Sequence, residues 1–257
     1  MKSLKSAKFI AALIVTCVWQ LMQLPTAFAK QRSFTIKLSA GQARQERNNV
    51  QIPNDENGDR FSLADIAGEG LLPAVRLEGV WAFKPKHELR VLMAPLSYTQ
   101  TGESDEPIRF AGSTFTNTEP VEATYRFNSW RIGYRYQWKS TENLDLWVGG
   151  TIKIRDAEIK LSQAGVVAID DDLGFVPLLH VAGVYRFGIK WSANFDVDAL
   201  GGGPGRAIDI GTGVGYQLSR SWRLGAELRA LEGGADIDEV YNFAWFNSAL
   251  LTLHYSS

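Results

Sequence analysis

The feature that most constrains the fold is the alternation of apolar and polar residues along 175–199, which is interrupted at 188–190. Successive side chains of a β-strand point to opposite faces, so this period-two pattern predicts two strands joined by a tight hairpin turn. One face is bulky and aromatic, as at Trp191, and the other is charged, as at Arg186 and Asp196. A bulky apolar face backed by a charged one is typical of a barrel with lipid outside and a polar lumen inside.

The first 29 residues do not belong to this pattern. They contain a basic start, an apolar run over 9–22 and the sequence Ala27-Phe28-Ala29, which together predict a cleaved signal peptide over 1–29. The sequence from 30 to 257 is then expected to form one domain. The single cysteine, Cys17, lies in the predicted signal peptide, so we expect no disulfide and no thiol chemistry in the mature chain.

Charge and hydropathy limit the kinds of protein that this sequence can encode. The signal segment carries three lysines and no acidic residue, so the 27 basic residues fall to 24 against 28 acidic ones, and the mature net charge is about −4. This balance argues against a nucleic-acid partner. Beyond the signal segment the sequence has no apolar run near the ~18 residues of a membrane helix. A membrane protein of this composition would have to cross with strands.

Alternation continues along the whole mature chain and predicts an all-β fold, a closed antiparallel transmembrane β-barrel of about ten strands. An eight-stranded barrel remains the alternative if the first strand or part of a loop is misassigned. The expected strands are 33–40, 73–83, 88–99, 123–138, 144–160, 175–187, 191–199, 206–218, 222–231 and 241–255.

The predicted connections alternate in length. Long polar loops are expected at 41–70, 101–120, 162–174 and 232–239, a shorter Gly/Pro turn at 201–206, and tight turns at 84–87, 139–143, 188–190 and 219–221. Tight turns at one rim and long loops at the other are typical of outer-membrane barrels with both termini in the periplasm. Tyr125 and Phe127 are out of phase with the rest of their strand, which predicts a β-bulge near Asn128.

Aromatic residues gather at the ends of strands that meet the tight turns. Such a ring is the girdle expected at a lipid headgroup boundary. The predicted girdle residues are Trp81, Phe83, Tyr136, Trp138, Tyr185, Phe187, Trp191, Tyr216, Trp222 and Tyr255.

With its signal segment, alternating strands, loop asymmetry and aromatic last strand, the chain resembles the small outer-membrane β-barrel proteins of Gram-negative bacteria. The resemblance covers the whole mature chain. It implies an integral outer-membrane location, contact with membrane lipids and lipopolysaccharide, and insertion by the barrel assembly machinery. Many such barrels end in an aromatic residue, whereas here Tyr255 is followed by Ser256 and Ser257.

Charged residues of both signs alternate onto the expected lumen face. We interpret them as neighbours that pair and fill a narrow barrel, for example Asp209 with Arg229, with Glu227 nearby, and Arg186 with Asp196 or Asp198. The other interpretation is a polar path, so the expected function is structural or that of a narrow channel for small solutes. The predicted lumen charges are Arg76, Glu78, Arg90, Arg131, Arg135, Lys153, Arg155, Arg186, Asp196, Asp198, Asp209, Glu227 and Arg229.

A catalytic function is the first alternative, with lipid A or a peptide as substrate. Among the three histidines, His180 lies toward the long-loop half of a strand on the polar face. A catalytic histidine needs a nucleophile or a carboxylate beside it. Its possible partners are 170–172, Asp198 and Ser162, but no nucleophile motif accompanies it, so the sequence predicts no enzyme.

A third alternative is a surface receptor or adhesin that acts through the loops 41–70 and 101–120. The acidic residues of 170–172 and 232–239 supply oxygen atoms of the kind that bind Ca²⁺, but their spacing matches no calcium loop. We therefore interpret them as solvated charge and predict no metal and no cofactor. The sequence gives no indication of oligomeric state.

Overall fold

The computed structural model describes residues 34–68, 70–203 and 205–257. The predicted signal peptide, 1–29, lies outside the described residues. In the part of the chain that is described, none of the α-helical segments has the length and apolar character needed to cross a membrane.

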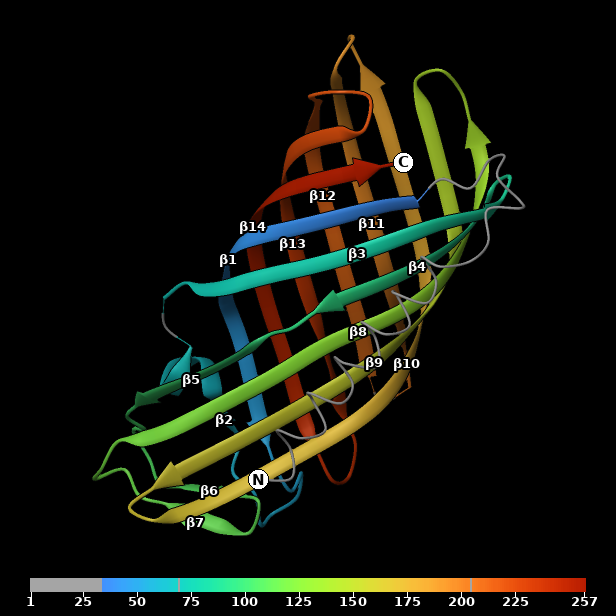
Figure 1. Cartoon of the computed structure of the whole chain (residues 1–257). Helices are drawn as coiled ribbons and strands as arrows, with labels where there is room; N and C mark the ends of the chain where they lie inside the picture. Colours follow the sequence, from blue (N-terminus) through green and yellow to red (C-terminus); the bar gives the residue numbers. More distant parts are fainter. Residues whose placement is uncertain (1–33, 69, 204) are drawn as a thin grey trace, which may run out of the picture. The chain divides into compact units, whose positions relative to one another are not determined.

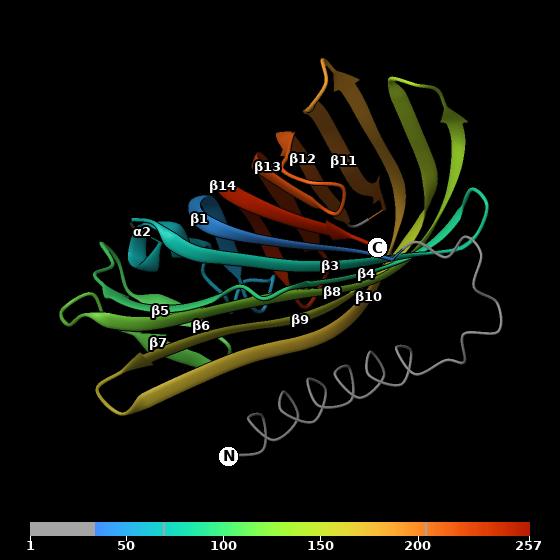
Figure 2. The same ribbon diagram turned by 45° about the horizontal axis from the view of Figure 1, so that its top comes forward.

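The long strands form one antiparallel sheet in which each pairs with the next along the sequence and the last pairs with the first (Figures 1 and 2). Ten strands close this barrel when β5 is counted as the continuation of β4, since both pair with β8. The ten-strand prediction is therefore confirmed, and the eight-strand alternative is wrong. The strands are β1 (Phe34–Gln51), β3 (Leu72–Lys84), β4 (His87–Ala94), β5 (Ser97–Gly102), β8 (Val121–Ser140), β9 (Leu144–Gln163), β10 (Val166–Phe187), β11 (Trp191–Gly202), β12 (Gly205–Gln217), β13 (Trp222–Asp236) and β14 (Tyr241–Ser256).

The strands extend farther from the tight turns than the sequence pattern indicated. The predicted loop 162–174 is wrong, because β9 and β10 pair from Gln163 and Val166 onward across a turn at Ala164 and Gly165. Both turn residues have positive φ, 48° and 84°, a conformation that favours glycine at the second position. The predicted loop 41–70 is also too long, since β1 continues to Gln51.

The physical reason is an inversion of the two strand faces along the barrel. Near the tight turns of β9 the outward residues are apolar and the inward ones polar; farther along, the outward residues are polar and the inward ones apolar. The outward sequence is Leu144, Leu146, Val148, Ile152 and Ile154, then Asp156, Glu158, Lys160 and Ser162; the inward sequence is Asp145, Thr151, Lys153 and Arg155, then Ala157, Ile159 and Leu161. The tight-turn half is therefore built for lipid contact, and the long-loop half is built like a water-soluble barrel.

The prediction of a bulge near Asn128 is wrong, and the inversion of the strand faces explains why. The pairing of β8 with β9 keeps one register from Glu122 to Gln137 and shifts only between Gln137 and Lys139. Tyr125 and Phe127 differ from the residues before the tight turn because they point inward, into an apolar interior, and not because the strand changes phase.

Short elements cap the long-loop end. They are β2 (Phe61–Ser62), α2 (Leu63–Ala67), β6 (Ile108–Phe110) and β7 (Ser113–Phe115), the last two forming a hairpin inside the predicted loop 101–120. The side chain of Ser62 caps α2 by accepting from the Asp65 backbone N–H at 3.3 Å. Leu63, Phe110 and Phe115 are fully buried with Tyr125 in the apolar core of this half.

A surface ion pair fastens two of these capping segments. Arg109 contacts Asp59 with its guanidinium at 2.6 Å, and its backbone N–H donates to the same carboxylate at 2.8 Å. The hydrogen bonds from Arg109 hold the pKa of Asp59 below its ordinary value.

The barrel wall is uneven in its long-loop half. β10 pairs with β9 along its length, but its pairing with β11 begins only at Leu179. The β11–β12 hairpin ends at Gly202 and Gly205. The segment 166–178 of β10 therefore extends past β11 on that side, which matters for the larger cavity described below.

Candidate functional site

The predicted lumen charges lie on the inner faces of their strands, most of them largely buried. Arg186, near the tight-turn rim, is the most exposed, with 44% of its side chain accessible. Arg155 lies at the other level, beside the larger cavity, and pairs with Asp172. Apart from Arg135, which pairs with Glu88, and Lys153, the other charges meet across the middle of the barrel.

Asp198 lies at the centre of this cluster of charged side chains. Its carboxylate accepts from Arg90 at 2.8 Å, from Arg131 at 2.7 Å and from the Thr151 hydroxyl at 3.1 Å. The Nδ1 atom of His180 lies 2.8 Å from Oδ1 of the same carboxylate. The Asp198 side chain has no exposed surface, so these groups replace the whole hydration shell of a buried charge.

Asp209 extends the network across the lumen. It accepts from Arg131 at 2.5 Å and Arg229 at 2.5 Å, and Arg76 lies 3.3 Å away. Arg229 also contacts Asp196 at 2.6 Å and Glu227 at 2.9 Å. The charges thus form one connected set, which we call the plug: Arg76, Arg90, Arg131, Asp196, Asp198, Asp209, Glu227 and Arg229.

The backbone of β12 makes room for this network. Its inward positions after Asp209 are Gly211, Gly213 and Gly215. A Cβ added at Gly211 would collide with the Arg229 guanidinium, so glycine at this position lets the guanidinium approach the strand closely.

The pairing predictions are partly correct. Asp209 pairs with Arg229 as expected. The pairing of Arg186 with Asp196 or Asp198 is wrong, because Arg186 pairs with Asp145 while Arg229 and Arg90 reach the two aspartates. Glu78 pairs with Arg90 and Arg135 with Glu88. Arg186 lies too near the tight turn for its side chain to be the partner of the mid-barrel carboxylates.

His180 belongs to the plug region. Among its proposed partners the structure brings Asp198 to it, and places the others elsewhere. Asp170 is ten residues farther along the same strand, about 33 Å at the usual strand rise, and Ser162 is on the outward face of β9. His180 is 2% exposed and lies in a carboxylate–guanidinium cluster.

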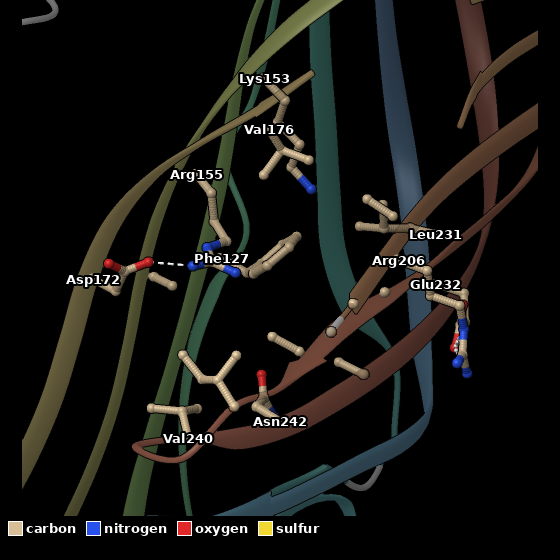
Figure 3. Close-up of a pocket in the computed structure, with 18 of the residues that line it drawn as sticks. Phe127, Lys153, Arg155, Asp172, Val176, Arg206, Leu231, Glu232, Val240 and Asn242 are labelled. Atoms are coloured by element: carbon tan, nitrogen blue, oxygen red, sulfur yellow. Dashed lines mark hydrogen bonds and ion pairs between the residues drawn. The ribbon is translucent and has the colours of Figure 1, made fainter. Parts of the chain in front are cut away.

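Two cavities lie on opposite sides of the plug. The smaller one, about 240 Å³, is toward the tight turns, and Lys37, Glu88, His180 and His254 are among its lining residues. The larger one, about 700 Å³, is in the long-loop half (Figure 3). The two share no lining residue, so the plug separates them.

The larger cavity has an apolar wall and a charged floor, the floor being the end nearest the plug. Tyr125, Ile159, Leu231 and Phe246 are among its apolar lining residues. Figure 3 shows Lys153, Phe127 and Arg155 on one side, across from Leu231 and Arg206. The cavity lies where β10 has separated from β11, since residues of both strands line it.

Charges at the side of this cavity are mostly paired. Arg155 pairs with Asp172, and Arg206 contacts Glu232 at 2.7 Å. Asp170 differs, because burial and the neighbouring carboxylates Asp171 and Asp172 raise its pKa. Asp170 and Asp172 share the inward face of β10, and Asp171 is on the other face.

The larger cavity is the feature that sequence reasoning missed. Its signal in the sequence is the inverted phase of Tyr125 and Phe127, a pattern that is also typical of a β-bulge. Nor does the acidic segment 232–239 form an isolated group, because β13 continues to Asp236, and Glu232 pairs with Arg206 and with Arg47 at 2.8 Å. Within the described ranges, no group of three or more His, Cys, Asp or Glu side chains is arranged to hold a metal ion.

The predicted girdle residues lie on outward strand faces near the tight turns. Several meet across neighbouring strands: Trp191 and Tyr216 have ring centroids 5.0 Å apart, as do Trp222 and Tyr255. Trp138 is 55% exposed. A half-exposed ring of paired aromatics is the arrangement expected where a barrel meets lipid headgroups.

No protein-family model matches this chain, and no curated protein matches it in sequence. Solved structures do. The outer membrane protease OmpT from Escherichia coli is 9% identical, with a TM-score of 0.58 over 88% of this chain and 97% of that one. The beta domain of the Bordetella autotransporter Brka is 10% identical, with a TM-score of 0.43 over 88% and 99%; Ail of Yersinia pestis is 11% identical, with a TM-score of 0.37 over 85% and 98%. The likeness to OmpT shows that the chain has the fold of an outer-membrane β-barrel.

Proposed function

We propose that this chain is an integral outer-membrane barrel that binds a small apolar or amphipathic molecule in its larger cavity and keeps the path through its centre closed. The tight turns then face the periplasm and the long-loop half faces outward. The observation that carries the proposal is the separation of the two cavities by the plug. A volume of about 700 Å³ falls within the range of small-molecule sites.

The alternatives have less support. A channel for polar solutes needs a connected aqueous path, whereas the middle of this lumen is filled by buried ion pairs such as Arg131 with Asp198. A histidine-dependent enzyme needs a base that faces its substrate. His180 lines the smaller cavity and contacts the plug instead, so we assign it a structural role and propose no catalytic activity.

Binding is tested with an uncharged fluorescent probe, N-phenyl-1-naphthylamine, added to the purified protein in an amphipathic polymer. We expect saturable binding to the wild type. Ala157→Phe places a ring in the larger cavity, which Ala157 lines, and is expected to weaken binding about tenfold or more.

Ala249→Phe is the matched control, because Ala249 is on the outward face of β14 and its binding should equal that of the wild type. Retention of the folded gel mobility without heating verifies that each variant is folded. Probe binding that does not saturate, or equal affinities for Ala157→Phe and the wild type, would contradict the proposed site.

A further inference from the structure

The side-chain amino group of Lys153 lies at the floor of the larger cavity and is not part of the plug. Lys153 is 2% exposed and lines the cavity. Its Nζ lies 4.3 Å from the centroid of the Phe127 ring. Among the described residues, Lys153 takes part in none of the ion pairs or side-chain hydrogen bonds of the barrel, which sets it apart from the arginines of the plug.

The carboxylates around Lys153 are already engaged. Asp209 is shared by three arginines. Asp172 is paired with Arg155, and Glu232 with Arg206. Lys153 therefore lacks a carboxylate partner among the described residues. Its contact with one aromatic face supplies less stabilisation of a positive charge than a carboxylate does at a desolvated site.

Two arginines lie next to Lys153, and both are already paired with carboxylates. Lys153 is directly opposite Arg131 in the β8–β9 ladder and two residues from Arg155 on the same strand. The carboxylate of Asp170 lies farther out, because Asp170 is six residues along β10 from Val176, the cross-strand partner of Lys153, or about 20 Å. The cavity is thus positive at its floor and acidic farther out, with apolar residues between.

We propose that the ligand of the larger cavity is an amphipathic anion whose carboxylate, sulfonate or phosphate binds Lys153 and whose apolar part lies along Ile159, Leu231 and Phe246. This inference rests on the proposed function, since it names the chemistry of the molecule that the cavity binds. An anionic head supplies the partner that Lys153 lacks, and the acidic outer part of the cavity disfavours the reverse orientation.

The test compares decanoate, decanol and decyltrimethylammonium as competitors of N-phenyl-1-naphthylamine. They share a ten-carbon chain and differ in charge. We expect decanoate to displace the probe from the wild type at a concentration about tenfold lower than decanol, and the cation to be the weakest. Phosphatidylglycerol as a further competitor identifies the source of the anion: displacement by it indicates a membrane lipid, and displacement by decanoate alone indicates a free amphiphile.

Lys153→Met should lose the preference for decanoate over decanol, with each displacement measured against the affinity of that variant for the uncharged probe, whereas Lys153→Arg should keep it. Lys160→Met is the control, because Lys160 is on the outward face of the same strand. Equal displacement by decanoate and decanol in the wild type overturns this inference while leaving the proposed function intact. Absence of probe binding overturns the proposed function itself. The wild-type comparison decides the matter even where Lys153→Met does not fold.

Discussion

Replacing Asp198 by alanine is expected to lower the free energy of unfolding by about 3–5 kcal/mol, because it removes a fully buried carboxylate that two buried guanidinium groups share. Arg90 and Arg131 both contact this carboxylate, at 2.8 and 2.7 Å, and neither has another route to solvent from the middle of the barrel. The midpoint of urea unfolding, followed by loss of the folded gel mobility, measures the change.

Asp105→Ala is the matched control. Asp105 is exposed in a loop, and its replacement is expected to change stability by no more than about 0.5 kcal/mol. Asp198→Asn keeps the shape and removes the charge, so it should lie between the wild type and Asp198→Ala. Equal midpoints for Asp198→Ala and Asp105→Ala would show that the plug does not hold the barrel together.

The second large effect is expected from Arg131→Ser combined with Arg229→Ser. These two side chains bridge Asp198, Asp209 and Asp196 across the lumen, so their removal joins the two cavities and leaves carboxylates lining the gap. We expect steady single-channel currents in a planar lipid bilayer, with a preference for cations over anions because the exposed charges are negative.

Arg44→Ser combined with Arg126→Ser removes the same number of guanidinium groups from outward positions on β1 and β8, and should leave the barrel closed. Arg131→Ser alone serves if the double variant does not fold, with smaller currents expected. A folded Arg131→Ser/Arg229→Ser barrel without current, or one that prefers anions, would show that these arginines do not close the lumen.

Much of the architecture could be predicted because lipid imposes a simple rule. Between Trp191 and Ala199, for example, outward residues had to be apolar and inward ones polar, so period-two alternation located β11. The girdle followed from Trp191 and its counterparts at the tight turns. The charged residues inside could be assigned to the lumen by the same alternation.

The rule fails where lipid ends. Beyond Ile154 the strand faces exchange character, so the polar run around Asp170 is typical of a loop although it continues β10. For the same reason the phase of Tyr125 and Phe127 is typical of a bulge although the strand is regular there. Alternation alone does not say which face is inward, and that is decided by what surrounds each half.

Which charges pair could not be predicted from one strand at a time. The pattern along one hairpin favours a pair of Arg186 with Asp196 or Asp198, whereas closure of the barrel brings Arg90, on β4, to Asp198, on β11. That Lys153 lacks a carboxylate partner also depends on this geometry. The carboxylates near it, such as Asp209 and Asp172, are paired with arginines.

The central claim is that the plug closes the barrel, and the ion current through the wild-type protein in a planar bilayer tests it most directly. With insertion verified by recovery of folded protein from the membrane, we predict no current above that of the empty bilayer, at either polarity and at high salt. A steady, reproducible conductance of the wild type would contradict the account, because it would require an open aqueous path where Arg131, Asp198, Asp209 and Arg229 are in contact.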